Sequence, residues 1–178
     1  MNALRWRLVK LRYRRLGIDL DGHHEDEIWH FAYGSNINPE VFEGRRRMRP
    51  RESRIARLPG YRLRFNLDGW PRGRSAPANI SPDPDAEVWG VLYRMTRRDL
   101  VRLDSTEGVP RRRGYRHLWT EVEDRDGGRF TAVTYIAQGK EHDGNPSLRY
   151  ITLIRDGARA QGLPAHHIEF LDSVRHAQ

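Results

Sequence analysis

The sequence contains no cysteine, which excludes disulfide bonds, thiolate metal sites and a cysteine nucleophile together. Any chemistry must therefore use oxygen, nitrogen or backbone groups. No apolar run approaches the roughly eighteen residues of a membrane-spanning helix, and the N-terminus lacks the compact apolar segment of a signal peptide. No glycine-rich phosphate-binding motif is present either. These absences predict a cytoplasmic protein that uses no nucleotide cofactor.

Lysine is scarce: of the 32 basic residues only Lys10 and Lys140 are lysines, and the formal net charge is +8. A preference for arginine throughout the chain is typical of a GC-rich coding background. A nucleic-acid-binding protein instead concentrates its basic residues on one face, with aromatic platforms among them. We therefore expect no nucleic-acid partner. The alternative is an arginine-driven nucleic-acid or membrane-surface binder, whose affinity would fall steeply with salt.

The first 27 residues change from basic to acidic along the chain. Arginines and Lys10 alternate with leucines and aromatic residues up to Arg15, and the acidic residues follow at 19–27. This pattern permits a basic amphipathic helix on an anionic membrane surface or on a partner. We favour a solvated extension, because the following acids can neutralise the segment, and we expect no stable membrane association. A second arginine cluster, at 45–51, is interpreted as a solvated surface loop.

The length of 178 residues and an apolar content of 37% suit one domain, which we place at 28–178 after the extension 1–27. Strand-like segments occur at 28–33, 54–58, 61–67, 78–81, 87–95, 115–123 and 129–137. Pro59-Gly60 is predicted to form a turn between two of these strands, and 68–77 to form a loop. Helices are expected at 39–44, from Thr96 to Gly108, from Ser147 onward and at 164–174. Many strands with short turns and segregated helices indicate an α+β fold.

The most informative stretch is 28–36, which reads Ile-Trp-His-Phe-Ala-Tyr-Gly-Ser-Asn. An apolar run that ends at Gly34, Ser35 and Asn36 is typical of a buried strand entering a tight turn, with positive φ expected at Gly34. Such a turn presents several backbone N–H groups together, which suits a carboxylate or a developing oxyanion. Taken alone, the segment is more typical of an ordinary turn between a strand and a helix.

Two further motifs follow in order. Residues 103–108 read Leu-Asp-Ser-Thr-Glu-Gly, and 146–150 read Pro-Ser-Leu-Arg-Tyr before the Gly-Leu-Pro of 162–164. Together with Tyr-Gly-Ser-Asn at 33–36, these motifs resemble the gamma-glutamylcyclotransferase family over most of the chain. The resemblance implies a small mixed β-barrel with flanking helices. Ile37 departs mildly from the leucine that the family usually has at that position.

The resemblance also implies an activity. Enzymes of this family cyclise a gamma-glutamyl amino acid or amine to 5-oxoproline and release the free amine. The substrate's own α-amine is the nucleophile, so the enzyme must fold the substrate, move protons and hold the oxyanion. The resemblance assigns both proton transfers to Glu107 and leaves Asp104 an orienting role at most. Without the resemblance, Glu107 would be interpreted as a surface residue that ends an amphipathic helix.

The residues that would bind the gamma-glutamyl group lie in and just before the first motif, and two tyrosines from later segments join them. The resemblance implies this role for His30, Phe31, Ala32, Tyr33, Gly34, Ser35, Asn36, Tyr115 and Tyr150. Tyr150 would suit a core position equally well if the family match were ignored, because Leu148 and Ile151 are its neighbours.

Neither a metal nor a cofactor is expected. The adjacent pairs His23-His24 and His166-His167 lack the spacing of metal ligands and are interpreted as surface features. Ser35 lacks the Gly-x-Ser-x-Gly elbow of a hydrolase nucleophile.

The expected partner is a small gamma-glutamyl molecule, but the released group stays open. An amino acid, an amine or a natural product that carries a gamma-glutamyl protecting group in specialised metabolism would each fit. Asn36 favours relatives other than the glutathione-specific ones, which resemble Tyr-Gly-Ser-Leu at this point. The loop 68–77 is expected to border the leaving group. A non-catalytic binding module of the same fold is the other alternative, and a homodimer is left open.

Overall fold

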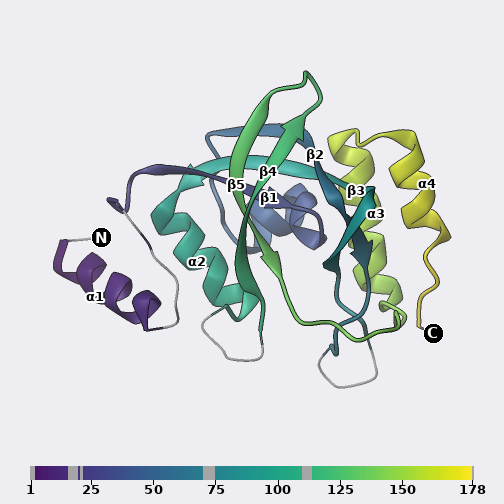
Figure 1. Cartoon of the computed structure of the whole chain (residues 1–178), viewed down its shortest axis with the longest axis horizontal. Coiled ribbons are helices and arrows are strands. Elements are labelled where there is room, and N and C mark those ends of the chain that lie inside the picture. Colours follow the sequence, from purple (N-terminus) through teal and green to yellow (C-terminus); the bar gives the residue numbers. More distant parts are fainter. Residues whose placement is uncertain (1–2, 16–19, 21, 70–74, 110–113, 178) are drawn as a thin grey trace.

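The centre of the computed structural model is a closed β-barrel with the strand order β1-β3-β2-β4-β5 (Figure 1). The structure describes residues 3–15, 20, 22–69, 75–109 and 114–177. The strands are β1 (Glu27–Ala32), β2 (Glu52–Arg64), β3 (Asn79–Thr96), β4 (Arg116–Asp124) and β5 (Arg129–Ile136). Most neighbours are antiparallel, and the parallel pairing of β1 with β5 at His30 and Val133 closes the barrel. The mixed barrel expected from the resemblance is confirmed.

The strand-like segments 115–123 and 129–137 form the antiparallel hairpin of β4 and β5, with Gly127 in its turn at a φ of 83°. The predicted turn at Pro59-Gly60 is wrong. Both segments that flank it belong to β2, which runs antiparallel to β3 along its whole length. The pairing moves from Pro59 opposite Glu87 to Tyr61 opposite Pro82, so the extra residues of β3 form a bulge there. Gly60 has a φ of 77°, and this left-handed conformation bends the strand without reversing it.

Helices α2, α3 and α4 flank the barrel on two sides (Figure 1). Helix α2 (Arg97–Glu107) begins at Thr96, whose hydroxyl accepts from the N–H of Asp99, and ends at Gly108 with a φ of 69°. Helix α3 (Leu148–Gln161) begins at Ser147, whose side chain accepts from the N–H of Tyr150. Helix α4 (Ala165–Ser173) follows directly and packs beside α3. The predicted caps of α2 and α3 are confirmed.

Two short helical segments follow β1. A 3₁₀ turn spans Ser35–Ile37, and a π-helix spans Glu40–Arg45. Asn38 precedes the π-helix, and its side-chain oxygen accepts from the N–H of Glu40 at 2.9 Å. Its amide nitrogen donates to the carbonyl of Leu153 at 3.0 Å. Asn38 therefore joins the first motif to helix α3.

The N-terminal segment differs from the favoured expectation. Residues Ala3–Arg14 form helix α1, which lies next to α2 at the edge of the molecule (Figure 1). Trp6 and Tyr13 are buried at 4% and 3% exposure and pack with Leu20. The interpretation as a solvated extension is therefore wrong for this face of the helix. Burial of these two aromatic rings against apolar neighbours stabilises the packed position of the helix, which the charge pattern of the segment did not predict.

The core fills the barrel and continues beneath α2 and α3. On α3, Ile151, Ile154 and Ala158 are fully buried, whereas Leu148, at its first residue, is 53% exposed. No helix among the described residues is long and apolar enough to cross a membrane. Half of the loop 68–77 that was expected to border a leaving group, residues 70–74, lies outside the described residues.

Candidate active site

The residues that the three motifs single out converge on one pocket at the end of β1. It is small, about 40 Å³, and its wall is made by the start of β3, the end of α2, the strands β1 and β5 and the first turn of α3. The lining residues are His30, Phe31, Ala32, Tyr33, Gly34, Ser35, Asn36, Ala78, Glu107, Tyr115, Tyr135 and Tyr150. Every residue proposed from the sequence to act on substrate therefore faces the same space.

Glu107 is the acidic member of this pocket. It is the last residue of α2, and its side chain is 13% exposed. Its Oε1 accepts from the amide nitrogen of Asn36 at 3.0 Å and lies 2.7 Å from a guanidinium nitrogen of Arg46. Thr106 accepts a second bond from the same arginine nitrogen. These contacts hold one carboxylate oxygen in place at the edge of the pocket.

The turn after β1 differs from the expectation at Gly34, whose φ is −102° rather than positive. A Cβ at Gly34 would lie 3.3 Å from the hydroxyl of Tyr150, a tight contact, and 3.5 Å from Ala78, so glycine lets the turn lie close against this phenol. The first bond of the 3₁₀ turn runs from the N–H of Ile37 to the carbonyl of Gly34 at 3.0 Å. Ser35 and Asn36 open this turn and line the pocket, and their N–H groups make no hydrogen bond within the turn.

Tyrosines form much of the remaining wall. The hydroxyl oxygen of Tyr150 accepts from the N–H of Ala78 at 3.2 Å and also from the N–H of Ser35. Because the oxygen accepts both bonds, the hydroxyl proton can be donated to another group. Burial raises the pKa of Tyr150 to about 12, so the phenol is neutral at physiological pH.

Other pocket tyrosines are held by backbone carbonyls. Tyr33 donates to the carbonyl of Tyr135 at 2.7 Å, and Tyr115 donates to the carbonyl of Ala78. Burial raises the pKa of Tyr33 and of Tyr115 well above the ordinary value. The neighbouring His30 lies with Nδ1 3.1 Å from the carbonyl of Val133, and burial lowers its pKa to about 4. At neutral pH, Glu107 is therefore surrounded here by uncharged rings.

A second carboxylate, Asp104, lies one turn before Glu107 and is fully buried. Its Oδ1 accepts from the hydroxyl of Tyr135 at 2.6 Å and lies 2.7 Å from Nε2 of His117. Its Oδ2 accepts from the hydroxyl of Tyr13 at 2.8 Å. Since Asp104 does not line the pocket and is engaged with these donors, its position fits the orienting role that we expected for it.

Sequence reasoning missed Arg46, Ala78, Tyr135 and the donors to Asp104. Arg46 was assigned to a solvated loop, but its side chain is only 18% exposed and contacts Glu107. No local pattern distinguishes Arg46 from the arginines beside it. Tyr135 could have been found, because it belongs to the apolar part of the predicted strand 129–137, where a buried phenol needs a hydrogen-bond partner.

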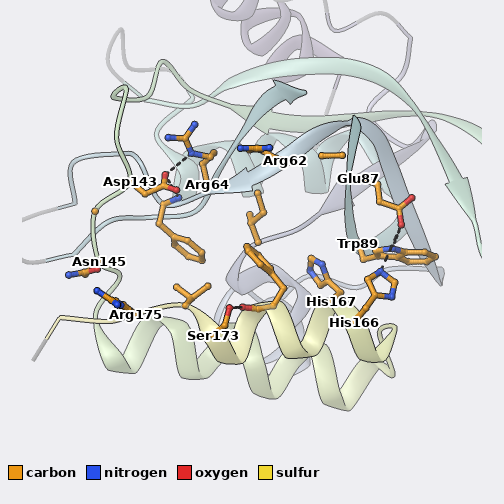
Figure 2. Close-up of a pocket in the computed structure, with 16 residues that line it drawn as sticks. Arg62, Arg64, Glu87, Trp89, Asp143, Asn145, His166, His167, Ser173 and Arg175 are labelled. Atoms are coloured by element: carbon orange, nitrogen blue, oxygen red, sulfur yellow. Dashed lines mark hydrogen bonds and ion pairs between the residues drawn. The ribbon is translucent and has the colours of Figure 1, made fainter. Parts of the chain in front are cut away.

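A larger cavity of about 820 Å³ lies between α4 and the strands β2 and β3 (Figure 2). Its carboxylates are engaged: Glu87 pairs with Arg57 at 2.7 Å, and Asp143 pairs with Arg64 at 2.7 Å. Both carboxylates are more exposed than Glu107, at 32% and 48%, and no residue of the three sequence motifs lines this cavity.

The histidine pairs are only partly surface features. His24 and His167 are buried at 7% and 5% exposure, which corrects the expectation for these two residues. Within the part of the chain that the structure describes, no group of histidine, aspartate and glutamate side chains could hold a metal ion.

The barrel and its pocket define a class of protein: a small α+β enzyme fold that presents one glutamate beside a turn of backbone N–H groups and a wall of neutral tyrosines. The AIG2-like family model matches residues 87–171. Human gamma-glutamylcyclotransferase is 31% identical over 164 residues, which cover 88% of this chain and 83% of the human protein. A gamma-glutamyl cyclotransferase of Aspergillus oryzae, aclK, is 27% identical and covers 84% of this chain and 60% of its own length.

Among solved structures, a gamma-glutamyl cyclotransferase superposes with a TM-score of 0.74 at 28% identity, covering 86% of this chain and 90% of its own. YkqA of Bacillus subtilis superposes with a TM-score of 0.73 at 28% identity and covers 85% of this chain and 56% of its own. The chain belongs to the gamma-glutamylcyclotransferase family and is an enzyme of that type. The resemblance drawn from the three motifs is thereby confirmed.

Proposed function

We propose that this enzyme cyclises a gamma-glutamyl amino acid or gamma-glutamyl amine to 5-oxoproline, with Glu107 as the general base and then the general acid. The observation that carries the proposal is the position of Glu107, a carboxylate in a small pocket with one oxygen held by Asn36 and Arg46. A carboxylate that is fixed in this way can remove a proton from an ammonium and return it to a leaving nitrogen.

The reaction needs no further reagent. Glu107 takes a proton from the substrate's α-ammonium, and the free amine attacks the γ-carbonyl carbon to form the new C–N bond of a five-membered ring. The oxyanion that forms meets the N–H group of Asn36 in the 3₁₀ turn and the hydroxyl proton of Tyr150, whose oxygen is held by the N–H groups of Ala78 and Ser35. Glu107 passes the proton that it took from the ammonium to the leaving nitrogen, and the second proton of the attacking nitrogen follows by the same route as the ring amide forms. The original C–N bond breaks, and 5-oxoproline and the amine, released as its ammonium, separate.

Charged groups near the pocket fit the charges of the gamma-glutamyl group. Its α-carbon carries an ammonium and a carboxylate, which differ in sign. Glu107 suits the ammonium, and the guanidinium of Arg46, 2.7 Å from Glu107, suits the carboxylate. The tyrosine wall leaves the rest of the site uncharged, which strengthens both interactions. Arg46 is thus assigned to recognition of the α-carboxylate.

The test is a panel of gamma-glutamyl dipeptides, gamma-glutamyl amines and glutathione, incubated with purified enzyme while mass spectrometry follows 5-oxoproline. We expect 5-oxoproline from at least one dipeptide or amine, with an equal amount of the released amine. The most active member identifies the leaving group. If no member yields 5-oxoproline while calorimetry still detects binding of gamma-glutamyl compounds, the protein is a binding module of the same fold and the proposal fails.

A further inference from the structure

Helix α1 is connected to the wall of the pocket through one side chain. Tyr13 lies near the end of α1, which lies at the edge of the molecule (Figure 1), and its hydroxyl donates to Oδ2 of Asp104 at 2.8 Å. Both partners are buried, at 3% and 0% exposure. The two residues are 91 positions apart in the chain, so this bond joins the N-terminal segment directly to the last turn of α2.

Asp104 connects that bond to the pocket in two ways. Its other carboxylate oxygen accepts from Tyr135 at 2.6 Å and lies 2.7 Å from His117, and Tyr135 lines the pocket. Its backbone carbonyl accepts from the N–H groups of Gly108 and Val109, which close the helix immediately after the catalytic glutamate. A displacement of Asp104 would therefore move both the tyrosine wall and the residue that carries out proton transfer.

The position of Asp104 explains why its donors matter. A carboxylate near the C-terminus of a helix faces the negative end of the helix dipole, and a buried one also lacks water. It stays in place only if hydrogen-bond donors satisfy its oxygens. Tyr135 and His117 share Oδ1, whereas Tyr13 bonds Oδ2. Without the Tyr13 hydroxyl, the carboxylate would turn toward other donors and its bonds to Tyr135 and His117 would weaken.

We propose that Tyr13 is a positioning residue, which fixes Asp104 and through it Tyr135 and the end of α2, so that helix α1 is part of the working enzyme. The catalytic part of this inference rests on the proposed function of Glu107. The role of Tyr13 differs from simple attachment of α1, which Trp6 also provides by donating to the carbonyl of Gly22 at 3.0 Å.

The test compares Tyr13→Phe, which removes one hydroxyl and keeps the ring, with two matched variants. Trp6→Phe weakens the attachment of α1 without touching Asp104. Tyr61→Phe removes a hydroxyl from β2 at a residue that does not line the pocket. For Tyr13→Phe we expect kcat to fall on the order of ten- to a hundredfold with KM within about twofold of wild type, because proton transfer is misaligned while the binding groups remain. Both control variants should stay within about twofold of wild type.

A second measurement does not depend on turnover. The ring nitrogen resonances of His117 report its contact with Asp104, and we expect them to shift in Tyr13→Phe and to stay unchanged in Trp6→Phe. Unchanged His117 resonances, or a loss of kcat that Trp6→Phe reproduces, would overturn the inference. If wild type forms no 5-oxoproline from any substrate, the proposed function fails, and the His117 resonances alone decide whether Tyr13 is coupled to the pocket.

Discussion

Arg46 and Glu107 are the charged pair at the edge of the pocket, and both side chains are largely shielded from solvent, at 18% and 13% exposure. A shielded pair interacts more strongly than an exposed one, because less water screens the charges. The same shielding makes the guanidinium an effective partner for a substrate carboxylate. Under the proposed function, recognition of the α-carboxylate falls to Arg46, one arginine in a cluster of several.

The variant Arg46→Gln tests this role. We expect KM for a gamma-glutamyl substrate to rise about tenfold or more, because a charge-assisted bond to the α-carboxylate is lost, while kcat falls less. Arg46→Lys should recover part of the affinity, since it restores the charge without the planar fork. Arg49→Gln, an exposed member of the same cluster, is the control and should behave as wild type. An unchanged KM in Arg46→Gln would remove this residue from substrate binding.

Strand β2 shows how a local element can differ from its sequence signals. Pro59-Gly60 has the composition of a turn, yet Pro59 and Tyr61 both pair with β3, and the bulge in β3 absorbs the irregularity. The glycine is needed for its φ of 77° alone, because a Cβ at this position would meet nothing within 4 Å. Gly60 therefore stabilises the fold only by adopting this backbone conformation easily, and not by leaving room for a neighbouring atom.

Gly60→Ala should lower the free energy of unfolding by about 1 kcal/mol, the cost of left-handed backbone for a residue with a Cβ. Gly44→Ala is the matched control: it also meets nothing within 4 Å, but its φ is not in the left-handed range. We expect it to leave stability unchanged or to raise it slightly, because alanine restricts the unfolded chain. Urea unfolding of both variants measures the difference. Equal stability of the two variants would show that the bulge tolerates a side chain.

The elements that the sequence predicts well are those whose signals are local. Thr96, Ser147 and Gly108 mark helix ends through their own backbone and side-chain chemistry, and the structure has helix ends there. The Pro59-Gly60 turn could not be rejected locally, since its true conformation depends on the partner strand. Helix α1 was misjudged for the same reason, because the burial of Trp6 and Tyr13 depends on distant residues.

The residues of the candidate site also fall into those that the sequence predicted and those that it did not. The motif residues were found because their spacing resembles a family, and the fold brings them to one pocket. Arg46 and the Asp104 network were not found, because their contacts join segments that are far apart in the chain. An isolated arginine or tyrosine gives no sign of which distant carboxylate it will meet.

At the scale of the whole molecule, buried histidines link stability to pH. Burial lowers the pKa of His30 and of His167 from 6.5 to about 4. Above pH 6.5 both are neutral whether the chain is folded or not. As pH falls from 6.5 toward 4, the unfolded chain takes up protons that the folded one does not, so stability is lost in this window. The loss is up to about 1.4 kcal/mol per pH unit for each group.

Urea unfolding between pH 7 and pH 4.5 measures this effect. We expect the free energy of unfolding of the wild type to decrease as pH falls, and the decrease to be smaller in His167→Gln, which removes one of the two groups. The exposed His142→Gln is the control and should keep the wild-type slope. Equal slopes in wild type and His167→Gln would show that burial of His167 does not contribute to the pH dependence.

The central claim is that Glu107 carries out both proton transfers in formation of 5-oxoproline. The most direct measurement is the turnover of Glu107→Gln on the best gamma-glutamyl substrate, followed as 5-oxoproline. Glutamine keeps the shape and an oxygen for the bonds from Asn36 and Arg46 but cannot accept the proton. We predict a loss of kcat on the order of 10²- to 10⁴-fold, with substrate still bound in calorimetry and folding unchanged. Turnover close to wild type would contradict the assignment of Glu107.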